Sequence, residues 1–443
     1  MERAGEVTVN GGTSPRAFFV LGCAVLSHPS MKHRPSRAVH RETPTHGVDR
    51  SVERGDVVVS ARGIASVAHG HPWIFHAAIV EGPTAPNGAI ARIVDERAKP
   101  LGSGIWDPSS PIAFRIWTRE PGVRLDAALF RARLERALAI RRELFSDGST
   151  TAYRLLNGEG DRVPGFVIDR YEDVAVLRID GVAARHAATE LLSDIEVPLR
   201  AAGITTLLDR TSNRGEAPTI DVRFGAMREK IVVREHGVPF VVDLARGQKT
   251  GAFLDQRENR RRVGELVARS ASRRVLNLFS YTGGFSLRAA LAGGTVTSVD
   301  VALAAHATAQ ESFRVAGVST KDHAFVTADA FAWLETAKKR GDRFDVVISD
   351  PPSFAPSEKA KPKGLAAYRT LHRACADVLA DGGTLVAASC SSHVTAEDFA
   401  ATLDDSALGR ADLRLLELFG APADHPSLPV FPEGRYLKLA VLA

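Results

Sequence analysis

The sequence predicts an α/β protein whose C-terminal part is a Rossmann-like, doubly wound parallel sheet, preceded by a small β domain and a small α+β domain. From about residue 273 onward, short apolar strands alternate regularly with helices. Between residues 56 and 118, strand-like runs are instead separated by turn residues at short intervals, which is typical of a small all-β unit. The stretch between these two regions mixes strands with helices.

Length and composition agree with several soluble domains. The chain has 443 residues, which is too long for one average domain, and its hydrophobic content of 44% and charged content of 25% are ordinary for globular proteins. No internal repeat interrupts the pattern. We therefore expect an N-terminal extension and three domains, with boundaries at 1–54, 55–125, 126–235 and 236–443.

Residues 1–54 differ in composition from the rest of the chain. A short apolar run, 17–26, precedes a stretch rich in Arg, His, Ser and Pro that has no sustained apolar period. The run is too short to span a bilayer, and the apolar stretch before Cys23 is too short for a lipoprotein signal. We expect either a disordered tail or an upstream start codon, with Met31 or a later codon as the true start. A basic arm for RNA is the functional alternative.

Charge and cysteine content indicate compartment and partners. The net charge of +5 favours a polyanionic partner without establishing one. The cysteines, Cys23, Cys375 and Cys390, are too few and too scattered for a disulfide framework or a zinc site. They suit a reducing compartment, so we predict a cytoplasmic protein without metal or membrane partner. The sequence leaves the oligomeric state open, with a homodimer among the alternatives.

The first two domains follow from local patterns. Strand-like runs are expected within 56–118, and a helix over 125–145 carries an arginine-rich outer face. That face suits phosphate, although a solvated helix face is the commoner meaning. The middle domain is predicted to contain strands within 151–171 around a glycine-rich turn, strands at 173–180, 205–210 and 230–244, and one helix over 186–203.

The C-terminal domain reads as five strands joined by four helices. Strands are predicted at 274–279, 295–300, 324–329, 344–350 and 383–390, and helices at 286–294, 302–317, 330–340 and 365–380. The last two strands, 413–419 and 435–443, would close the sheet with an antiparallel edge.

The stretch "DVVISDPPSF", 345–354, marks where a ligand should bind. Its β-branched residues form a buried parallel strand, and Pro351 and Pro352 stop the ladder because they cannot donate to it. Asp350 is left at the carboxyl end of a strand, where open α/β sheets bind their ligands.

The other strand ends favour a nucleoside. In "FSYTGGF", 279–285, Gly283 and Gly284 allow a tight turn and close approach of a ligand, but no G-x-G-x-x-G loop for a dinucleotide is present. Asp300 ends the second strand and can accept both hydroxyls of a ribose, and Asp329 ends the third and can accept from an adenine amino group. Each acid alone is more often a helix N-cap. Together they predict an S-adenosylmethionine pocket.

A thiol at the neighbouring strand end suggests the chemistry. Cys390 closes the fifth strand beside Asp350. A thiolate that adds to carbon 6 of a pyrimidine makes carbon 5 nucleophilic, and a carboxyl at N3 can receive the charge pushed there. Free cysteines are usually buried and inert, which is our interpretation of Cys375 on its helix.

The ordered set of motifs resembles a known family. "GAFLDQRENRR", "VLNLFSYTGGFSL", "DPPSF", "GGTL…SCS" and "ADHP…FPEGRYLK" together resemble the ribosomal RNA large-subunit methyltransferase I type. These are cytosine-C5 enzymes that use S-adenosylmethionine. "HPWIF", 71–75, looks like the start of that family's PUA-type RNA-binding domain, and the likeness covers about 56–443.

The resemblance implies roles for individual residues. It implies large-subunit (23S) ribosomal RNA as substrate and Cys390 and Asp350 as the catalytic pair, with Lys249 and Arg257 as candidates for contacts to RNA phosphate or the donor carboxylate. It implies donor contacts and contacts to the target base as follows: Gln256, Arg257, Tyr281, Gly283, Asp300, Asp329 and Asp350 for the donor; Pro351, Pro352 and Phe354 for the base.

The sequence departs from the family at several positions. Ser353 stands where family members often have Lys, and Ser312 and Ala316 stand where Asn is common in the helix after the second strand, which we interpret as surface or packing drift. The Asp-Pro-Pro motif also lacks the second cysteine with which many RNA cytosine methyltransferases release product. Two rival functions stay open: an amino-group methyltransferase, which needs no cysteine, and a non-catalytic RNA-binding protein. An NAD-linked dehydrogenase is a distant third because the phosphate loop is absent.

Overall fold

The computed structural model describes residues 55–211, 218–270 and 273–443. The predicted N-terminal extension, 1–54, lies outside the described residues. Among those that are described, no helix has both the length and the apolar character needed to cross a membrane.

A six-stranded sheet forms the first part of the described chain. Its strands run in the order β2-β6-β5-β4-β1-β3. The elements are β1 (Asp56–Val59), α1 (Ala61–His69), β2 (Trp73–Phe75), β3 (Ile79–Glu81), β4 (Ile90–Val94), β5 (Pro100–Trp106) and β6 (Ile112–Thr118). The expectation of an all-β unit was wrong at α1. Val67 on this helix packs into the sheet's core beside Val57 and Val59, so the apolar residues at 57–67 serve a strand and then a helix.

A five-stranded sheet with order β11-β10-β9-β8-β7 follows. Its elements are α2 (Ala127–Leu144), β7 (Ala152–Asn157), β8 (Phe166–Tyr171), β9 (Val174–Ile179), α3 (Val182–Leu191), α4 (Glu196–Ala201), β10 (Thr206–Thr211) and β11 (Thr219–Phe224). The single helix predicted over 186–203 is two, because Pro198 fits only the first turn of a helix. The sequence reading also missed β11, although its residues, TIDVRF, alternate apolar with polar side chains; the strand is mostly exposed.

A hairpin and a helix lead into the last sheet. The hairpin pairs β12 (Lys230–Glu235) with β13 (Val238–Asp243), and α5 (Arg257–Arg269) follows it. Ser312 Oγ on a later helix accepts a hydrogen bond from the backbone N–H of Val241 at 3.1 Å, which ties the hairpin to the C-terminal part.

The last sheet has seven strands in the order β16-β15-β14-β17-β18-β20-β19. Its elements are β14 (Arg274–Leu278), α6 (Gly284–Leu291), β15 (Thr295–Asp300), α7 (Leu303–Val315), β16 (Ala324–Thr327), α8 (Ala330–Arg340), β17 (Phe344–Ser349), α9 (Lys361–Asp377), β18 (Leu379–Ser389), α10 (Ala396–Ala400), α11 (Asp405–Leu408), β19 (Leu415–Phe419) and β20 (Lys438–Leu442). β14 to β18 are parallel to their neighbours, and β20 pairs antiparallel with both β18 and β19. The predicted doubly wound sheet with an antiparallel edge is confirmed.

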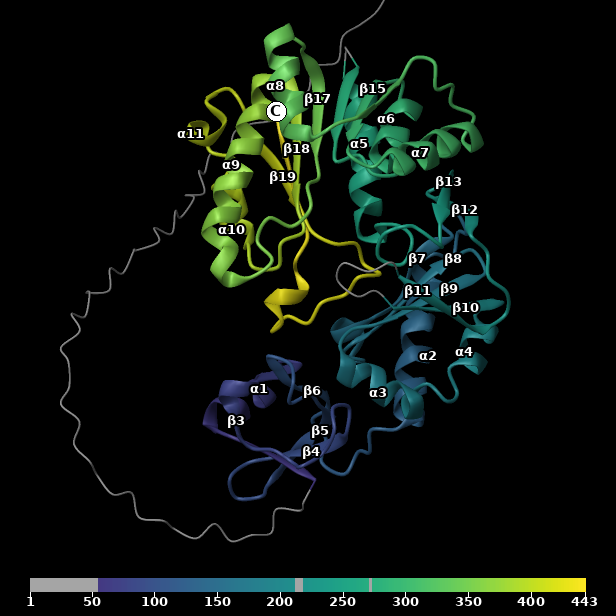
Figure 1. Ribbon diagram of the computed structural model, residues 1–443, viewed down its shortest axis with the longest axis vertical. Helices are drawn as coiled ribbons and strands as arrows, with labels where there is room; N and C mark the ends of the chain where they lie inside the picture. The colour runs from purple at the N-terminus through teal and green to yellow at the C-terminus, as the bar shows by residue number, and fades with distance from the viewer. Residues whose placement is uncertain (1–54, 212–217, 271–272) are drawn as a thin grey trace, which may run out of the picture. The chain divides into compact units, whose positions relative to one another are not determined.

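Helices cover both faces of this sheet. Figure 1 shows α5, α6 and α7 on one side and α8 and α9 on the other. The strands alternate between the two cores with the period of two that a strand dictates: Val346 and Ile348 pack with α5 and α6, whereas Val347 packs with α8 and α9. Burial on both faces explains why β17 reads as an unbroken apolar run.

Candidate active site

A cavity of about 250 Å³ lies at the carboxyl ends of the parallel strands. The consecutive strands β15-β14-β17-β18 of the sheet end at this cavity: Asp300 ends β15, Asp350 follows β17 and Cys390 follows β18. The predicted site residues that line it are Lys249, Gln256, Tyr281, Asp300, Asp350, Pro351, Pro352 and Cys390.

The structure leaves four of the predicted site residues outside this lining. Gly283 is next to it and makes the left-handed N-cap of α6 at φ +73°. Phe354 turns into the core instead, with its ring 4.8 Å from that of Tyr368. Arg257 and Asp329, the other two, have partners of their own.

Arg257 and Asp329 are engaged elsewhere. The Arg257 guanidinium is buried and donates two hydrogen bonds to Asp424, at 3.0 and 2.8 Å. Asp329 is exposed, follows the end of β16 at Thr327 by two residues, and caps α8 by accepting from the N–H of Ala332. The expectation that Asp329 ends the third strand was therefore wrong, and its carboxylate satisfies a helix terminus.

The glycine turn brings backbone close to the cavity at an energetic cost. Phe279 and Tyr281 adopt positive φ angles of 56° and 47°, which side-chain-bearing residues rarely do. A Cβ at Gly283 would lie 2.8 Å from the Ala309 side chain, and one at Gly284 would lie 2.7 Å from Arg260. The turn thus accepts only glycine at these positions without movement. Strain concentrated at one turn is typical of a binding site.

Asp300 is held at the cavity by the same turn. Its two oxygens accept the N–H groups of Tyr281 at 2.7 Å and Ala302 at 2.9 Å. A carboxylate offers about four acceptor positions, so this pair of bonds leaves capacity for hydroxyl donors from a ligand. Ser280 Oγ, also in the lining, is buried without a hydrogen-bond partner among the described residues.

Asp350 is the acid whose protonation changes near neutral pH. It is half-buried and accepts one hydrogen bond, from Gln256 Nε2 at 3.0 Å. Burial, together with the nearby carboxylate of Asp255, raises the pKa of Asp350 to about 7. Burial and the charge of Asp350 also raise the pKa of the Cys390 thiol. Near neutral pH the thiol therefore keeps its proton, whereas Asp350 is present in both its ionised and its protonated forms.

Asp255 is a site residue that our sequence reasoning missed. It is buried, and its Oδ2 accepts from Lys249 Nζ at 3.0 Å and from the Tyr436 hydroxyl at 2.7 Å. Burial alone would raise the pKa of Asp255, but Lys249, His425 and Tyr436 outweigh it and hold that pKa well below its usual range. Its Oδ1 has no partner in the described chain. Both Asp255 and Tyr436 lie within quoted motifs, so motif membership was the available signal.

The turn that carries Cys390 is fixed from two sides. Ser391 Oγ is bonded to Ser353 Oγ at 2.9 Å and to the Tyr368 hydroxyl at 3.0 Å, which joins the Asp-Pro-Pro loop to the end of β18. Lys438 Nζ donates to the Ser391 carbonyl at 2.6 Å. Burial lowers the pKa of Lys438 to about 8. Cys375, by contrast, is fully buried on α9, and burial raises its pKa to about 12.

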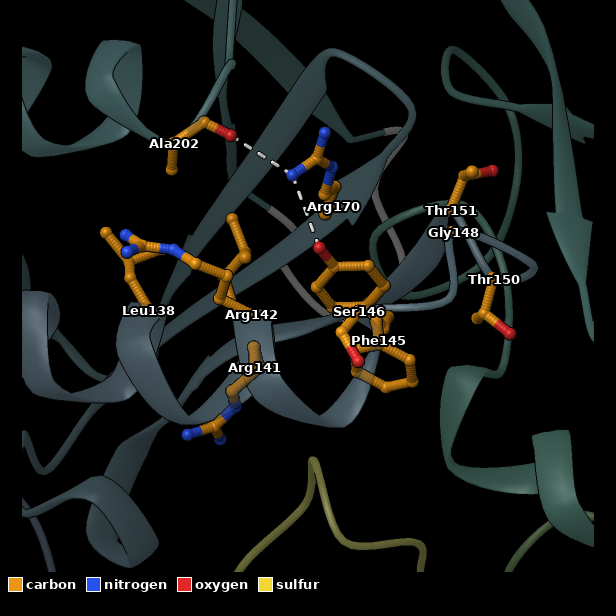
Figure 2. Close-up of a pocket in the computed structure, with 12 residues that line it drawn as sticks. Leu138, Arg141, Arg142, Phe145, Ser146, Gly148, Thr150, Thr151, Arg170 and Ala202 are labelled. Atoms are coloured by element: carbon orange, nitrogen blue, oxygen red, sulfur yellow. Dashed lines mark hydrogen bonds between the residues drawn. The ribbon is translucent and has the colours of Figure 1, made fainter.

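A second cavity, of about 310 Å³, lies over the five-stranded sheet and contains none of the predicted site residues. Figure 2 shows Arg170 donating to the Tyr153 hydroxyl and to the Ala202 carbonyl, at 3.2 and 3.1 Å. Arg141, also in its lining, pairs with both oxygens of Asp161. Since these guanidinium groups already have protein acceptors, this cavity is less suited to an anionic ligand than its arginines suggest.

Comparisons with known proteins indicate an S-adenosylmethionine-dependent methyltransferase. The family model for S-adenosylmethionine-dependent methyltransferases matches residues 206–435, and a PUA-like domain model matches residues 57–119. The chain is 38% identical over 400 residues to a ribosomal RNA large subunit methyltransferase of Deinococcus radiodurans, covering 87% of this chain and 96% of that one. It is 34% identical over 381 residues to ribosomal RNA large subunit methyltransferase I of Shigella boydii, covering 84% and 95%.

Solved structures agree with the fold. A methyltransferase structure complexed with SAH superposes with a TM-score of 0.74 at 24% identity, covering 87% of this chain and 99% of that chain. A further SAM-dependent methyltransferase structure, from Streptococcus mutans, gives the same TM-score at 23% identity. The predicted arrangement, a PUA-like β region ahead of a methyltransferase sheet, is confirmed.

Proposed function

The chain belongs to the ribosomal RNA large-subunit methyltransferase I family of S-adenosylmethionine-dependent enzymes, and from this premise we propose that it methylates carbon 5 of a cytosine in large-subunit (23S) ribosomal RNA through a covalent bond to Cys390. One observation carries the proposal. One cavity is lined by Cys390, by Asp350 and by Asp300, whose carboxylate can accept hydrogen bonds from the hydroxyls of a nucleoside. We further propose that the protein acts in the cytoplasm. We also propose that its domains are divided near residues 125 and 235.

The cavity contains polar groups that can bind S-adenosylmethionine. Asp300 retains acceptor capacity for the ribose hydroxyls, and Ser280 Oγ has an unused polar atom for the ligand. The glycine turn, where a Cβ would clash, lets backbone approach the nucleoside. When bound, S-adenosylmethionine supplies the electrophilic methyl group that an activated carbon 5 needs.

Cys390 and Asp350 would activate the base together. The ionised Asp350 takes the thiol proton, and the thiolate forms a bond to carbon 6 of cytosine. The same carboxyl, now protonated, donates to N3, where the displaced electron pair collects. A pKa near 7 suits a group that must accept and then give a proton at neutral pH. After methylation, water or another base removes the carbon 5 proton, the carbon 6–sulfur bond breaks, and the thiolate leaves.

The surrounding charges would support this cycle. Asp255 stays ionised beside Lys249, so the second carboxylate of the cavity keeps Asp350 inclined to hold its proton. Pro351 and Pro352 line the cavity with rigid apolar surface against which the base can lie. Lys249 also reaches to within 4.5 Å of the Phe253 ring centroid, which restricts where its ammonium group can go.

The test compares two cysteine variants on one substrate. Wild type, Cys390→Ser and Cys375→Ser are each incubated with labelled S-adenosylmethionine and unmodified large-subunit ribosomal RNA. We expect 5-methylcytosine from wild type and Cys375→Ser, and a loss of at least about 1000-fold for Cys390→Ser. Equal label from all three would remove Cys390 from the chemistry and favour an amino-group methyltransferase. No label and no S-adenosylmethionine binding from any of them would favour a non-catalytic RNA-binding protein, whereas donor binding without label would mean that the RNA offered is not the substrate.

A further inference from the structure

A third cavity, of about 470 Å³, lies where the PUA-like sheet meets the five-stranded region. Three arginines from three different elements converge on it. Arg119 follows β6, Arg133 lies on α2, and Arg162 ends the short turn that leads to β8. Only Arg133 belongs to the arginine-rich helix face seen in the sequence, so the cluster is a product of the fold. We call these three residues the arginine cluster.

The arginine cluster has no acidic partner. None of its three guanidinium groups forms an ion pair with a carboxylate among the residues that the structure describes. Glu159, in the same lining, is already bonded to Arg115 at 3.1 Å and to the Trp73 indole at 2.8 Å. Glu120, at the exposed rim, is the other acid of the lining; it forms no ion pair within the described residues, although its charge acts to raise the pKa of Arg133. The cavity therefore carries an excess of positive charge.

Each arginine is also positioned by the protein. Arg133 lies over the Trp117 ring at 5.7 Å from its centroid and donates to the Arg162 carbonyl. Arg162 adopts a left-handed backbone conformation at φ +60°, an uncommon choice for a residue with a long side chain. Arg119 Nη1 lies 3.4 Å from the Ala68 carbonyl. Holding like charges together costs free energy that a bound anion would recover.

Mutual repulsion is visible in the ionisation of the cluster. Burial and the charge of Arg162 lower the pKa of Arg133 to about 10. Burial and the charges of Arg119 and Arg136 lower that of Arg162 as well. In the cavity of Figure 2, by contrast, Arg141 and Arg170 bond to carboxylate, hydroxyl and carbonyl oxygens of the protein.

We propose that Arg119, Arg133 and Arg162 bind a backbone phosphate of the ribosomal RNA substrate. The inference rests on the proposed function, because that function makes RNA the ligand. Guanidinium groups match phosphate oxygens with paired donors, and phosphate contacts fix the register of a nucleic acid without reading its sequence. Leu428 lines this cavity and Leu437 lines the reactive one, so the single segment 428–437 leads from one to the other. A strand held at the arginine cluster would run toward Cys390.

The experiment measures RNA affinity against salt concentration. Arg119→Gln and Arg162→Gln are made singly and together, with Arg131→Gln as the matched control, because Arg131 lies exposed on α2 outside this cavity. Each protein is titrated with an unmodified large-subunit RNA fragment, and its S-adenosylmethionine affinity is measured by calorimetry. We expect a loss of about tenfold in RNA affinity for each substitution, and a salt slope reduced by roughly 0.7 to 0.9 per arginine.

Two further readouts separate binding from folding. Arg162→Lys keeps the charge, so it should retain the wild-type salt slope and recover most of the affinity. The affinity for S-adenosylmethionine should stay within about twofold for all variants. In methyl transfer, the KM for RNA should rise while kcat is preserved. A variant that lost S-adenosylmethionine binding would be misfolded. The RNA affinity and salt slope of Arg119→Gln would then test the inference, because the Arg119 side chain is exposed.

The outcomes distinguish this inference from the proposed function. The phosphate site would be overturned if the Arg119 and Arg162 variants had the same RNA affinity and the same salt slope as Arg131→Gln. The proposed function would stay intact in that case, provided that wild type methylates the RNA. A wild type that neither bound nor methylated the RNA would overturn both. Losses seen with assembled subunits and absent with naked RNA would assign the cluster to an acidic segment of a ribosomal protein, and would also overturn the inference.

Discussion

The reactive cavity and the packed region behind it contain two carboxylates in opposite environments. Asp350 is half-buried with one amide donor, Gln256, and its pKa is raised to about 7. Asp424 is fully buried, yet it receives two bonds from Arg257 and one from the backbone N–H of Arg154. Burial alone would raise the pKa of Asp424, but the neighbouring His425 and Arg257 hold it well below its usual range.

The contrast shows how the same residue type serves stability in one place and chemistry in another. A buried carboxylate with a guanidinium partner stays ionised, and removing its charge leaves the arginine uncompensated. A buried carboxylate without such a partner has a raised pKa, and its ionisation lowers the free energy of unfolding. Substitutions that remove only the charge should therefore move the two sites in opposite directions.

The largest effect is expected at Asp350. Asp350→Asn should lower methyl transfer by about 10²- to 10⁴-fold, because the amide can neither take the thiol proton nor return one to the base. Initial rates with saturating donor and RNA would measure this. Activity within a few fold of wild type would exclude Asp350 as the proton carrier.

The same variant should be more stable than wild type in alkaline solution. The pKa of Asp350 in the folded protein, about 7, lies above its value of about 3.9 in an unfolded chain. Wild type thus loses stability as the pH rises from about 4 to 7, whereas Asp350→Asn does not. We expect equal free energies of unfolding near pH 4 and a gain of about 4 kcal/mol for the variant at pH 8. A pH-independent difference in denaturant titrations would contradict the assignment.

Asp424→Asn should destabilise the fold by about 3 to 5 kcal/mol, since the Arg257 guanidinium would be left buried without its counter-charge. Asp412→Asn is the matched control: its carboxylate pairs with Arg410 at the surface, where solvent screens the charges, so the substitution should leave the denaturation midpoint nearly unchanged. Denaturation midpoints would measure both. Because the pKa of Asp424 is depressed in the folded state, its contribution is present above about pH 4 and is lost as the pH falls.

The two carboxylates also show how far the sequence could be taken. Asp350 was predictable because a β-branched run ends in an acid and two prolines, and the sheet topology places that end next to Cys390. Asp424 was not, because its carboxylate pairs with Arg257, 167 residues away along the chain, and its backbone carbonyl accepts from Arg141, 283 residues away. Sequence patterns report local periodicity, so they predicted nearly every strand of the last sheet but not these long-range contacts. Asp329 failed for a related reason: the sequence shows an acid near a strand end, but not whether it turns to the cavity or to a helix terminus.

Asp300 and Asp329 sharpen this point for donor binding. Asp300→Asn should weaken S-adenosylmethionine binding by about 10- to 100-fold, because it removes charged acceptors for hydroxyl groups. Asp329→Asn should leave donor affinity within about threefold, since asparagine caps a helix as well as aspartate does. Calorimetry on both variants would measure this. A large loss at Asp329 would restore the role that the family resemblance implied.

The smallest effect is expected at Ser353, where the sequence lacks the family's lysine. Its hydroxyl bonds to Ser391 Oγ at 2.9 Å, but Ser391 also has the Tyr368 hydroxyl at 3.0 Å. Ser353→Ala therefore leaves Ser391 with a partner and should cost at most about 1 kcal/mol of stability, with methyl transfer within about threefold. Ser391→Ala is the comparison: it removes a hydrogen-bond partner from both the Ser353 and the Tyr368 hydroxyls and should cost about 1 to 3 kcal/mol. If denaturation shows the reverse order, the Asp-Pro-Pro loop is held mainly by Ser353, and the loop rather than the end of β18 positions Cys390.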